Sequence, residues 1–369
     1  MESARELGFE IAGVAAVEAF AELRRFPAWI ETGQAGEMRY LARRTAAAGG
    51  PYLREDIRNA FPWARSVICC GLVYNTRQPK SVERDSSERG WISRYAWGDD
   101  YHGVLLEQLK ALARRLRQEA QGGEDGEHID QRVYVDTGPV LERVYAHHAG
   151  LGWLGKNTCL ISQRHGSYFF LGTLVCSLEI EPDASAHAPV ADRCGSCTRC
   201  IEACPTQALR PYEMDASRCI AYLNIELRGP IPEPLREAMG SNVLGCDICQ
   251  DVCPWNRSAT VTEMAAFQPR PGLVHPELEM LAGLDEAGYR ELFRNSAIKR
   301  AKWAGLRRNV AVAMGNSGNS RFRERLQAWS ESEDAVLREH AQWALQKLAE
   351  AENERREESS RNSPSNAKF

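Results

Sequence analysis

The chain has 369 residues, of which 43% are hydrophobic and 26% are charged, and its formal net charge is -4. This length accommodates two or three domains, with a sizeable core in at least one of them. No stretch approaches the roughly 20 apolar residues needed to cross a bilayer, which excludes a membrane-spanning protein. The slightly acidic balance also excludes a global basic field, so any contact with nucleic acid must be local.

The first residues, MESARELGFEIAGVAAVEAF, are acidic where a signal peptide is positively charged, and they contain no twin-arginine motif. We therefore expect a cytoplasmic protein that has no membrane partner. The chain has 12 cysteines. Because disulfides are rare in a reducing compartment, we expect most of these cysteines to be metal ligands or buried thiols.

Residues 1 to about 185 alternate strand-like and helical patterns, which predicts an α/β or α+β domain. The strand-like segments are residues 66–74, 132–136 and 167–178, and a helical pattern covers residues 101–120. Four cysteines in this part are predicted to be core thiols, because a free cysteine behaves as a small hydrophobe. They are Cys69, Cys70, Cys159 and Cys176.

Asp136 follows the strand-like segment RVYV and precedes the helical pattern LERVYAHHAG. An Asp or Thr followed by Pro is a common start of a helix, so Asp136 has an ordinary structural interpretation. A carboxylate at the end of a strand, beside a glycine turn, is also well placed for proton transfer in a cleft. The two roles are compatible.

The segment GLGWLGKN at residues 150–157 formally matches the G-x-G-x-x-G pattern of dinucleotide-binding folds. That motif requires a strand before it and a helix after it. Here a helical pattern precedes the segment and strand-like CLIS follows it, so we reject a dinucleotide site. A glycine loop that approaches a large flat ligand and a plain helix-ending turn both remain open. His147 and His148 are expected to be surface or capping residues.

Residues 194–205 read CGSCTRCIEACP, which is the C-x2-C-x2-C-x3-C-P pattern of bacterial ferredoxins. In this pattern three thiolates converge on one [4Fe–4S] cubane, and the cysteine before the proline is carried to a neighbouring cluster. A second cluster is therefore required. The segment CDICQDVCP at residues 246–254 supplies three further cysteines, and the isolated Cys219 supplies the missing one.

The eight cysteines divide into two predicted ligand sets. Cluster one is assigned to Cys194, Cys197, Cys200 and Cys253. Cluster two is assigned to Cys204, Cys219, Cys246 and Cys249. Two four-cysteine zinc sites would use the same number of thiolates. The cysteine triplet with a terminal Cys-Pro is typical of ferredoxins, however, and it favours iron–sulfur clusters.

Helical patterns return beyond the clusters. LRRNVAVAM from Leu306 and LREHAQWAL from Leu337 share Leu, Arg, Ala and a bulky apolar residue, which predicts stacked helix pairs of the HEAT type. The tail from Ala351 is charged and rich in Ser and Asn, so we expect it to be disordered. Between the N-terminal domain and the first cysteine run, EPDASAHAPVADR predicts a linker.

A basic run, KRAKWAGLRR, covers residues 299–308. Such a run is usually a solvated helix face. The same charges can hold RNA phosphates, which makes the run a candidate RNA-binding segment. Its basic residues are Lys299, Arg300, Lys302, Arg307 and Arg308.

The motifs VDTGPVLER, GLGWLGKN, CGSCTRCIEACP and GCDICQDVCPWN, together with the lone Cys219 and the helical end, resemble epoxyqueuosine reductases over nearly the whole chain. The resemblance implies an α+β fold in three parts. These parts are a nitroreductase-like cobalamin-binding domain (1–185), a two-cluster bacterial ferredoxin-like domain (186–265) and HEAT-like helical repeats (266–350), before the tail (351–369). It also implies reduction of epoxyqueuosine to queuosine at the wobble position of tRNA, the last step of queuosine biosynthesis.

The resemblance further implies that electrons pass through two [4Fe–4S] clusters to cobalamin, and that Asp136 is the proton donor. The segments expected to surround the cobalamin contain Arg58, Tyr101, His102, Asp136, Gly155 and Leu160. The implied partners are a tRNA with a GUN anticodon, held in part by the basic run, and an external electron donor. We expect a monomer. Two alternatives are a dehalogenase-like reductase of a small molecule and a plain electron-transfer ferredoxin.

Overall fold

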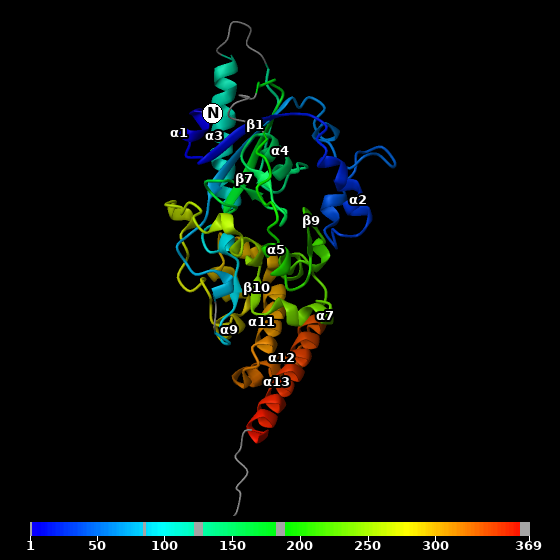
Figure 1. Cartoon of the computed structure of the whole chain (residues 1–369), viewed down its shortest axis with the longest axis vertical. Coiled ribbons are helices and arrows are strands. Elements are labelled where there is room, and N and C mark those ends of the chain that lie inside the picture. The colour runs from blue at the N-terminus through cyan, green and yellow to red at the C-terminus, as the bar shows by residue number, and fades with distance from the viewer. Residues whose placement is uncertain (1, 84–85, 122–127, 182–188, 362–369) are drawn as a thin grey trace, which may run out of the picture.

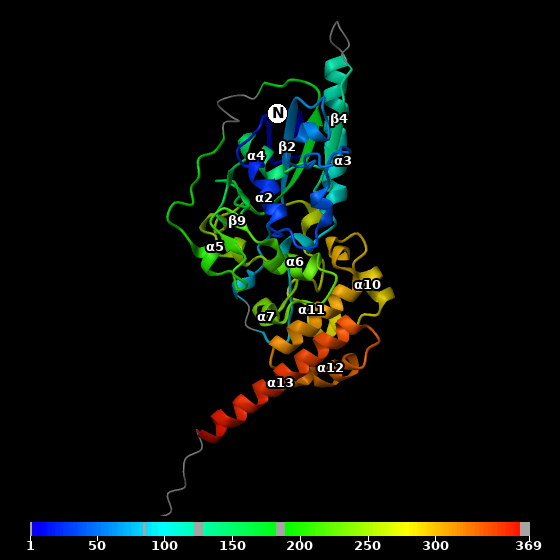
Figure 2. The same cartoon turned by 90° about the vertical axis from the view of Figure 1, so that its right-hand side faces the viewer.

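The computed structural model describes residues 2–83, 86–121, 128–181 and 189–361. The molecule is elongated, with an N-terminal sheet near one end, helices at the other end and the cysteine-bearing segments between them (Figures 1 and 2). Among these residues, no helix is both long and apolar enough to cross a membrane. The predicted linker lies largely in residues 182–188, which are outside the described part of the chain.

The N-terminal region is built on a four-stranded antiparallel sheet in the order β1-β2-β7-β4. Its strands are β1 (Ile11–Ala16), β2 (Ser66–Val73), β7 (Phe169–Cys176) and β4 (Gln131–Tyr134). The three segments that alternation and apolar character marked as strands are therefore confirmed. A fourth strand, β1, completes the sheet edge.

Helices cover both faces of this sheet. Helix α3 (Tyr101–Gln121) packs on one face, and the shorter α4 (Glu142–His148) packs on the other. Successive residues of the central strand β2 point to opposite faces, so Cys70 joins the core under α3 and Cys69 joins the core under α4. Both thiols, like Cys176, are completely buried. Their prediction as core residues is confirmed.

A second core unites the cysteine region with the C-terminal helices. It also takes in Trp91, Ile92 and Trp97 from the N-terminal part of the chain. Strand β3 (Trp91–Ile92) pairs in parallel with β10 (Asn242–Leu244), which fixes this insertion. Residues from both sides of the domain boundary expected at residue 185 therefore share one core.

The remaining elements are short. The small hairpins pair β5 (Trp153–Leu154) with β6 (Leu160–Ile161) and β8 (Leu209–Arg210) with β9 (Glu213–Met214). The short helices are α1 (Glu2–Glu6), α2 (Phe26–Glu31), α5 (Arg199–Glu202), α6 (Ile220–Ile225), α7 (Glu233–Arg236), α8 (Ile248–Asp251), α9 (Leu278–Ala282) and α10 (Glu286–Leu292).

The C-terminal end is formed by α11 (Lys302–Asn316), α12 (Arg323–Ser330) and α13 (Ala335–Arg361). The two similar segments noted in the sequence both lie in helices, α11 and α13, whose apolar faces share one core. The expectation of disorder from Ala351 is wrong, because α13 continues to Arg361. Residues 352–361 are mostly Glu and Arg, which favour helix. Residues 362–369 are outside the described part.

Candidate active site and cysteine clusters

Asp136 lies in a tight loop directly after β4, and its backbone is left-handed, with φ 58°. Helix α4 begins only at Glu142, so Asp136 does not cap it. The loop is held from two sides. The Asp136 amide donates to Glu142 Oε1 at 2.9 Å, and Arg54 Nη2 donates to the Gly138 carbonyl at 2.7 Å. A strained non-glycine residue that is held in this way is typical of a functional position.

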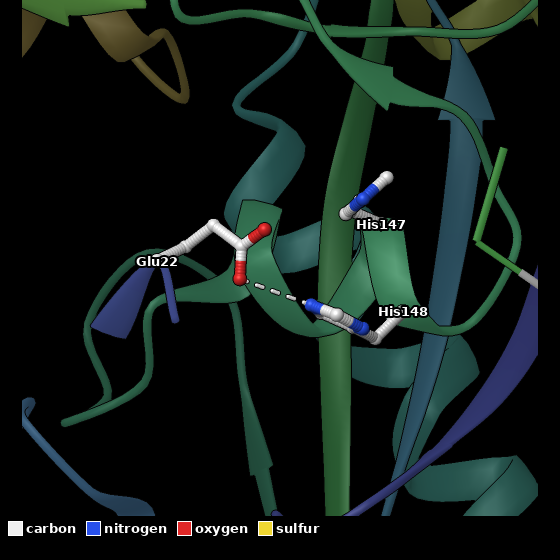
Figure 3. Close-up of side chains that lie close together, drawn as sticks. All are labelled: Glu22, His147 and His148. Carbon is white, nitrogen blue, oxygen red and sulfur yellow. Dashed lines mark hydrogen bonds and ion pairs between the residues drawn. The ribbon is translucent and has the colours of Figure 1, made fainter. Parts of the chain in front are cut away.

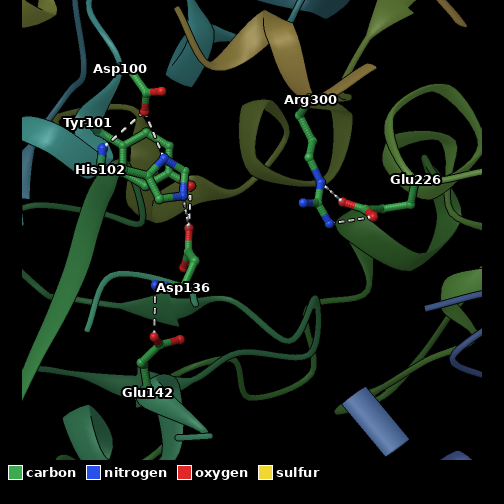
Figure 4. Close-up of polar contacts among 7 residues, drawn as sticks. All are labelled: Asp100, Tyr101, His102, Asp136, Glu142, Glu226 and Arg300. Carbon is green, nitrogen blue, oxygen red and sulfur yellow. Dashed lines mark hydrogen bonds and ion pairs between the residues drawn. The ribbon is translucent and has the colours of Figure 1, made fainter. Parts of the chain in front are cut away.

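The Asp136 carboxylate meets the first turn of α3 (Figure 4). Tyr101 donates its hydroxyl hydrogen to Asp136 Oδ2, and His102 Nε2 lies 3.7 Å from the same oxygen. His102 Nδ1 lies 2.7 Å from Asp100 Oδ1, which orients the imidazole. The Asp136 side chain is 51% exposed. The arrangement is therefore an accessible carboxylic acid backed by two groups that can carry protons.

Two neighbours of Asp136 have shifted proton affinities. Burial raises the pKa of Glu142 to about 8, and the negative charge of Asp136 adds to this rise. Burial opposes a charged His102, but its hydrogen bond with Asp100 and the charges of Asp136 and Asp100 outweigh burial, so the pKa of His102 is raised. Near neutral pH, Glu142 is thus protonated and His102 retains a proton more readily than a free histidine.

The other residues predicted to surround the cobalamin lie elsewhere. Arg58 is exposed and forms an ion pair with Asp56 at 2.6 Å. The Leu160 side chain is buried in the core under α4. Gly155 lies in the β5–β6 hairpin, where an added Cβ would meet Ile161 Cδ1 at 2.5 Å. The structure therefore brings together Tyr101, His102 and Asp136 and places the remaining three outside this contact.

The basic run divides into exposed and enclosed residues. Lys299, Arg300 and Lys302 are exposed. Arg300 forms two hydrogen bonds of 2.8 Å with Glu226, and Figure 4 shows this pair near the Asp136 site. The positive charge of Arg300 is near enough to oppose the rise in the pKa of His102. Lys299 likewise acts on Asp100, so these two residues of the exposed part border the acid site.

Arg307 and Arg308 differ from these residues. Arg308 is 2% exposed, and its guanidinium donates to three backbone carbonyls at 2.6–2.9 Å. Its prediction as an RNA contact is wrong, because the charge is enclosed and satisfied inside the protein. Arg307 is half-buried, with its guanidinium 4.6 Å from the ring of Trp303 and 5.4 Å from that of Trp329. The carbonyls bonded to Arg308 belong to Leu223, Leu227 and Gly229.

The four cysteines assigned to cluster one line a single cavity of about 220 Å³. Three come from the first cysteine run, and Cys253 comes from the second. Burial raises the pKa of the Cys253 thiol to about 11, and the nearby thiols of Cys194 and Cys200 contribute to the rise. Binding of a metal requires such thiols to lose their protons. The set has the number and type of donors that a cubane cluster needs.

The second group lies beside the first. Burial raises the pKa of Cys246, and the thiols of Cys219 and Cys204 raise it further. Cys249 adjoins Cys246 and Cys219. Cys159, which we expected in the core, instead shares a hydrogen bond with Cys249 and is partly exposed. The lone Cys219 is thus next to the cysteines with which spacing grouped it.

A buried indole beside the first cavity has an N–H group that could donate a hydrogen bond to a group bound there. Trp153 is 1% exposed, and its Nε1–H has no acceptor in normal geometry among the described residues. Its ring packs against Cys194 and Cys253. Burial raises the pKa of the Cys194 thiol, and the N–H groups of Lys156 and Trp153 oppose that rise. A sulfur-rich group bound to these cysteines would supply the missing acceptor.

A second polar cluster lies beside the start of the β5–β6 hairpin and consists of Glu22, His147 and His148 (Figure 3). Glu22 Oε2 lies 3.1 Å from His148 Nε2, and the His148 ring stacks on Phe20. His147 Nδ1 lies 2.8 Å from the Gly152 carbonyl, so the imidazole donates to it. These contacts fix the end of α4 and the start of the hairpin, and they give both histidines partners in the fold. As the sequence patterns on either side predicted, α4 precedes the glycine segment and the hairpin strand β6 follows it.

Several residues near these sites were not foreseen. Glu142 belongs to VDTGPVLER, but no role was predicted for it, and Glu226 is an ordinary acidic residue in the sequence. Trp153, Lys156 and Asn157 belong to GLGWLGKN, which was noted only for its glycines. The density of Trp, Lys and Asn in that short segment is the one signal that could have identified them.

The fold and the cysteine groups define an iron–sulfur oxidoreductase that carries two clusters. Consistent with this class, residues 193–256 match the family described as 4Fe-4S double cluster binding domain. Residues 54–137 match the family described as epoxyqueuosine reductase QueG, DUF1730.

Relatives identify the family. Epoxyqueuosine reductase from Synechocystis sp. is 44% identical over 81% of this chain and 98% of its own. A crystal structure of epoxyqueuosine reductase with an epoxyqueuosine-modified tRNA-Tyr stem loop has a TM-score of 0.80 and 28% identity, covering 99% of this chain and 93% of that one. The Bacillus subtilis enzyme, solved with its aspartate catalytic loop swung out of the active site, has the same TM-score and identity over 99% and 94% of the two chains. The chain belongs to the epoxyqueuosine reductase family, as the resemblance implied.

Proposed function

We propose that this chain reduces epoxyqueuosine to queuosine at the wobble position of a tRNA with a GUN anticodon, and that Asp136 supplies a proton. Membership of the family supports the reaction. The observation that carries the role of Asp136 is its accessible carboxylate in a left-handed loop, bonded to Tyr101 and close to His102. A plain electron-transfer ferredoxin would have no use for such a site.

Removing an epoxide oxygen to leave an alkene takes two electrons and two protons, and amino-acid side chains do not supply the electrons. The clusters and the cobalamin implied by the resemblance supply reducing chemistry when they are bound. The chain's own residues handle the protons. Asp136 gives a proton to the departing oxygen. His102 then returns a proton to Asp136, and Tyr101 holds the same carboxylate oxygen through its hydrogen bond.

Electrostatics supports this division of roles. The raised pKa of His102 keeps a proton available near neutral pH. Protonated Glu142 accepts the Asp136 amide through its carbonyl oxygen, so it holds the loop without adding a second negative charge. Asp136 itself remains half exposed, which leaves room for a nucleotide to approach.

In this proposal residues 1–185 form a nitroreductase-like domain that holds cobalamin near Arg58, Tyr101, His102, Gly155 and Leu160. Residues 186–265 hold the clusters through the two assigned cysteine sets, and residues 266–350 form HEAT-like repeats. The shared core of α11 and α13 supports the last assignment. We further propose that the enzyme works as a cytoplasmic monomer and receives electrons from an external donor.

The exposed part of the basic run is proposed to hold the RNA backbone. Lys299 and Arg300 border the acid site, and Lys302 is exposed on the same run, so phosphates bound there would keep the anticodon arm near Asp136. The wobble base must leave the stack to reach a protein pocket, as single-stranded bases do in RNA recognition. The structure of a relative with a tRNA stem loop supports RNA as the substrate class.

The proposal is tested by Asp136→Asn, with nucleoside mass spectrometry of epoxyqueuosine-modified tRNA as the assay. Asn keeps the shape and removes the acidic proton, so turnover should fall by about 10²- to 10⁴-fold. Iron content and cluster absorption should stay at wild-type values. Asp99→Asn is the matched control, because Asp99 is also half exposed and forms an ion pair with Arg270. Near-normal turnover of Asp136→Asn would refute the role of Asp136.

A further inference from the structure

The hairpin loop at residues 153–159 reaches from the sheet region to both cysteine groups. Lys156 Nζ donates to the carbonyls of Gly195 and Cys197 at 2.6 and 3.2 Å, on the cluster-one side. Asn157, which is 1% exposed, donates to the Cys249 carbonyl at 3.2 Å on the other side. One short loop of the N-terminal region therefore anchors the backbone around both proposed clusters.

Trp153 stands at the start of this loop and is its most enclosed member. The indole packs against Cys194 and Cys253, two of the four cysteines that line the cluster-one cavity. Its Nε1–H is buried without an acceptor of normal geometry among the described residues. A buried N–H group without an acceptor costs roughly 1–3 kcal/mol, so native structures rarely keep one.

The indole has little freedom to turn toward a different acceptor. Trp153 pairs with Ile161 in the β5–β6 hairpin, and Trp255 packs edge-on against its ring at 4.9 Å. The preceding Gly152 is pressed against the opposite strand, where an added Cβ would lie 2.2 Å from the Ile161 carbonyl. His147 donates to the carbonyl of Gly152. The N–H direction is thus set by the fold before any group is bound.

We propose that Trp153 is a positioning residue that donates a hydrogen bond to the Cys194 sulfur of cluster one and so makes that cluster easier to reduce. The inference rests on the proposed ligand set of cluster one. Reduction adds negative charge to the cluster, and hydrogen bonds to its sulfurs are among the features that set its potential. In an enclosed cavity this effect is larger than it would be in water.

The test is Trp153→Phe, which keeps an aromatic ring but removes the N–H group together with the second ring of the indole. Potentiometry followed by electron paramagnetic resonance should show one of the two midpoint potentials becoming more negative. The expected shift is about tenfold in the reduction equilibrium, which for one electron is about 59 mV. The other midpoint should not move. Cys200→Ser, which alters a proposed ligand of cluster one, identifies which midpoint belongs to that cluster.

Trp255→Phe is the matched control, because Trp255 lines the same cavity and contacts Trp153. It should leave both potentials unchanged. Iron content distinguishes a failure of the proposed function from a failure of the role of Trp153. Wild-type protein without clusters would defeat the proposed function, whereas unchanged midpoints in Trp153→Phe that holds all its iron would overturn only the role of Trp153.

A second measurement leaves Trp153 in place and so does not depend on the folding of Trp153→Phe. In Trp255→Phe protein labelled with ¹⁵N-indole tryptophan, pulsed resonance on reduced cluster one should detect a coupled indole nitrogen and an exchangeable proton. Trp153 is the tryptophan that packs against Cys194 in that background. Detection of both couplings supports the hydrogen bond. Their absence, with cluster one reduced, would overturn it.

Discussion

The acid site and the cysteine region lie in opposite environments. Asp136 is 51% exposed and His102 is 39% exposed, and both face outward from a loop and a helix start. Trp153 and Asn157, which hold the cysteine region, are each 1% exposed. The difference matches the two tasks. The proposed proton donor must be reachable by a macromolecule, whereas the proposed cluster ligands, of which only Cys253 is buried, must be held at fixed positions.

The largest expected effect lies in the enclosed region. Cys219→Ser should remove cluster two, because Cys219 is the proposed fourth ligand of that cluster and a serine is a poor ligand for it. Iron should fall from about eight toward about four per chain after anaerobic purification, since each cubane holds four irons. Reductase activity should be lost with it. The measurement combines iron and sulfide analysis with resonance spectra.

Cys176→Ser is the control for this variant, because Cys176 is a buried core thiol distant in sequence from the cluster motifs. It should keep both clusters. Two intact clusters in Cys219→Ser would mean that another thiol completes the set. Cys159 would then be the first candidate, since it already shares a hydrogen bond with Cys249.

The next effect separates an enclosed cation from an exposed one in the same basic run. Arg308→Gln should lower the free energy of unfolding by about 2–4 kcal/mol, because it leaves buried carbonyls without their charged donor. Arg300→Gln loses an exposed ion pair with Glu226 and should cost about 0.2–1 kcal/mol. Anaerobic urea denaturation of the two holoproteins measures the difference. Equal costs would remove the distinction between the two environments.

These residues also show where sequence reasoning succeeds and where it stops. Cysteine spacing predicted two groups of thiols, and the four cysteines predicted for cluster one do line one cavity in the structure. Tyr101, His102 and Asp136 were found through the family resemblance, and the fold does bring them together. The basic run was identified by residue type alone. Type does not reveal that Arg308 faces the carbonyls of α6 and the following turn, since that depends on how distant segments pack.

Other features were beyond the sequence for the same reason. The roles of Trp153 and Glu142 depend on contacts across the fold. The tail beyond Ala351 was expected to be disordered from its charge, yet Glu and Arg also favour helix. Arg323 of α12 forms an ion pair with Glu352 at 2.7 Å, which helps to continue α13. Composition alone does not decide between these outcomes.

A smaller effect is expected at the rim of the open site. Replacing Lys299, Arg300 and Lys302 together with Ala should weaken binding of a tRNA anticodon arm by roughly tenfold at low salt. The slope of log affinity against log salt should flatten by about two, since each phosphate contact in single-stranded RNA contributes about 0.7. Both clusters should be unchanged. Fluorescence anisotropy over a salt series gives the affinity and the slope.

The matched control for the rim variant replaces Lys110, Arg114 and Arg115 on the outer face of α3, which removes the same charge away from the acid site. Its affinity should fall less and its salt slope should stay near the wild-type value. If the two triple variants behave alike, the RNA responds to overall charge. The exposed part of the basic run would then not be the docking segment.

The smallest expected effect concerns Glu142, a residue of low exposure that accepts a hydrogen bond from the amide of the exposed Asp136. Its pKa is raised from 4.5 to about 8 in the folded protein. Between these values the folded chain keeps a proton that the unfolded chain has lost, so the free energy of unfolding falls as pH rises through this window. Gln still accepts the Asp136 amide but does not titrate. Glu142→Gln should therefore gain stability over wild type, and the gain should grow from pH 6 to pH 8 by about 2–4 °C in Tm. Anaerobic thermal scans at the two pH values measure it, and a gain that is the same at both would show that Glu142 is charged in the folded protein.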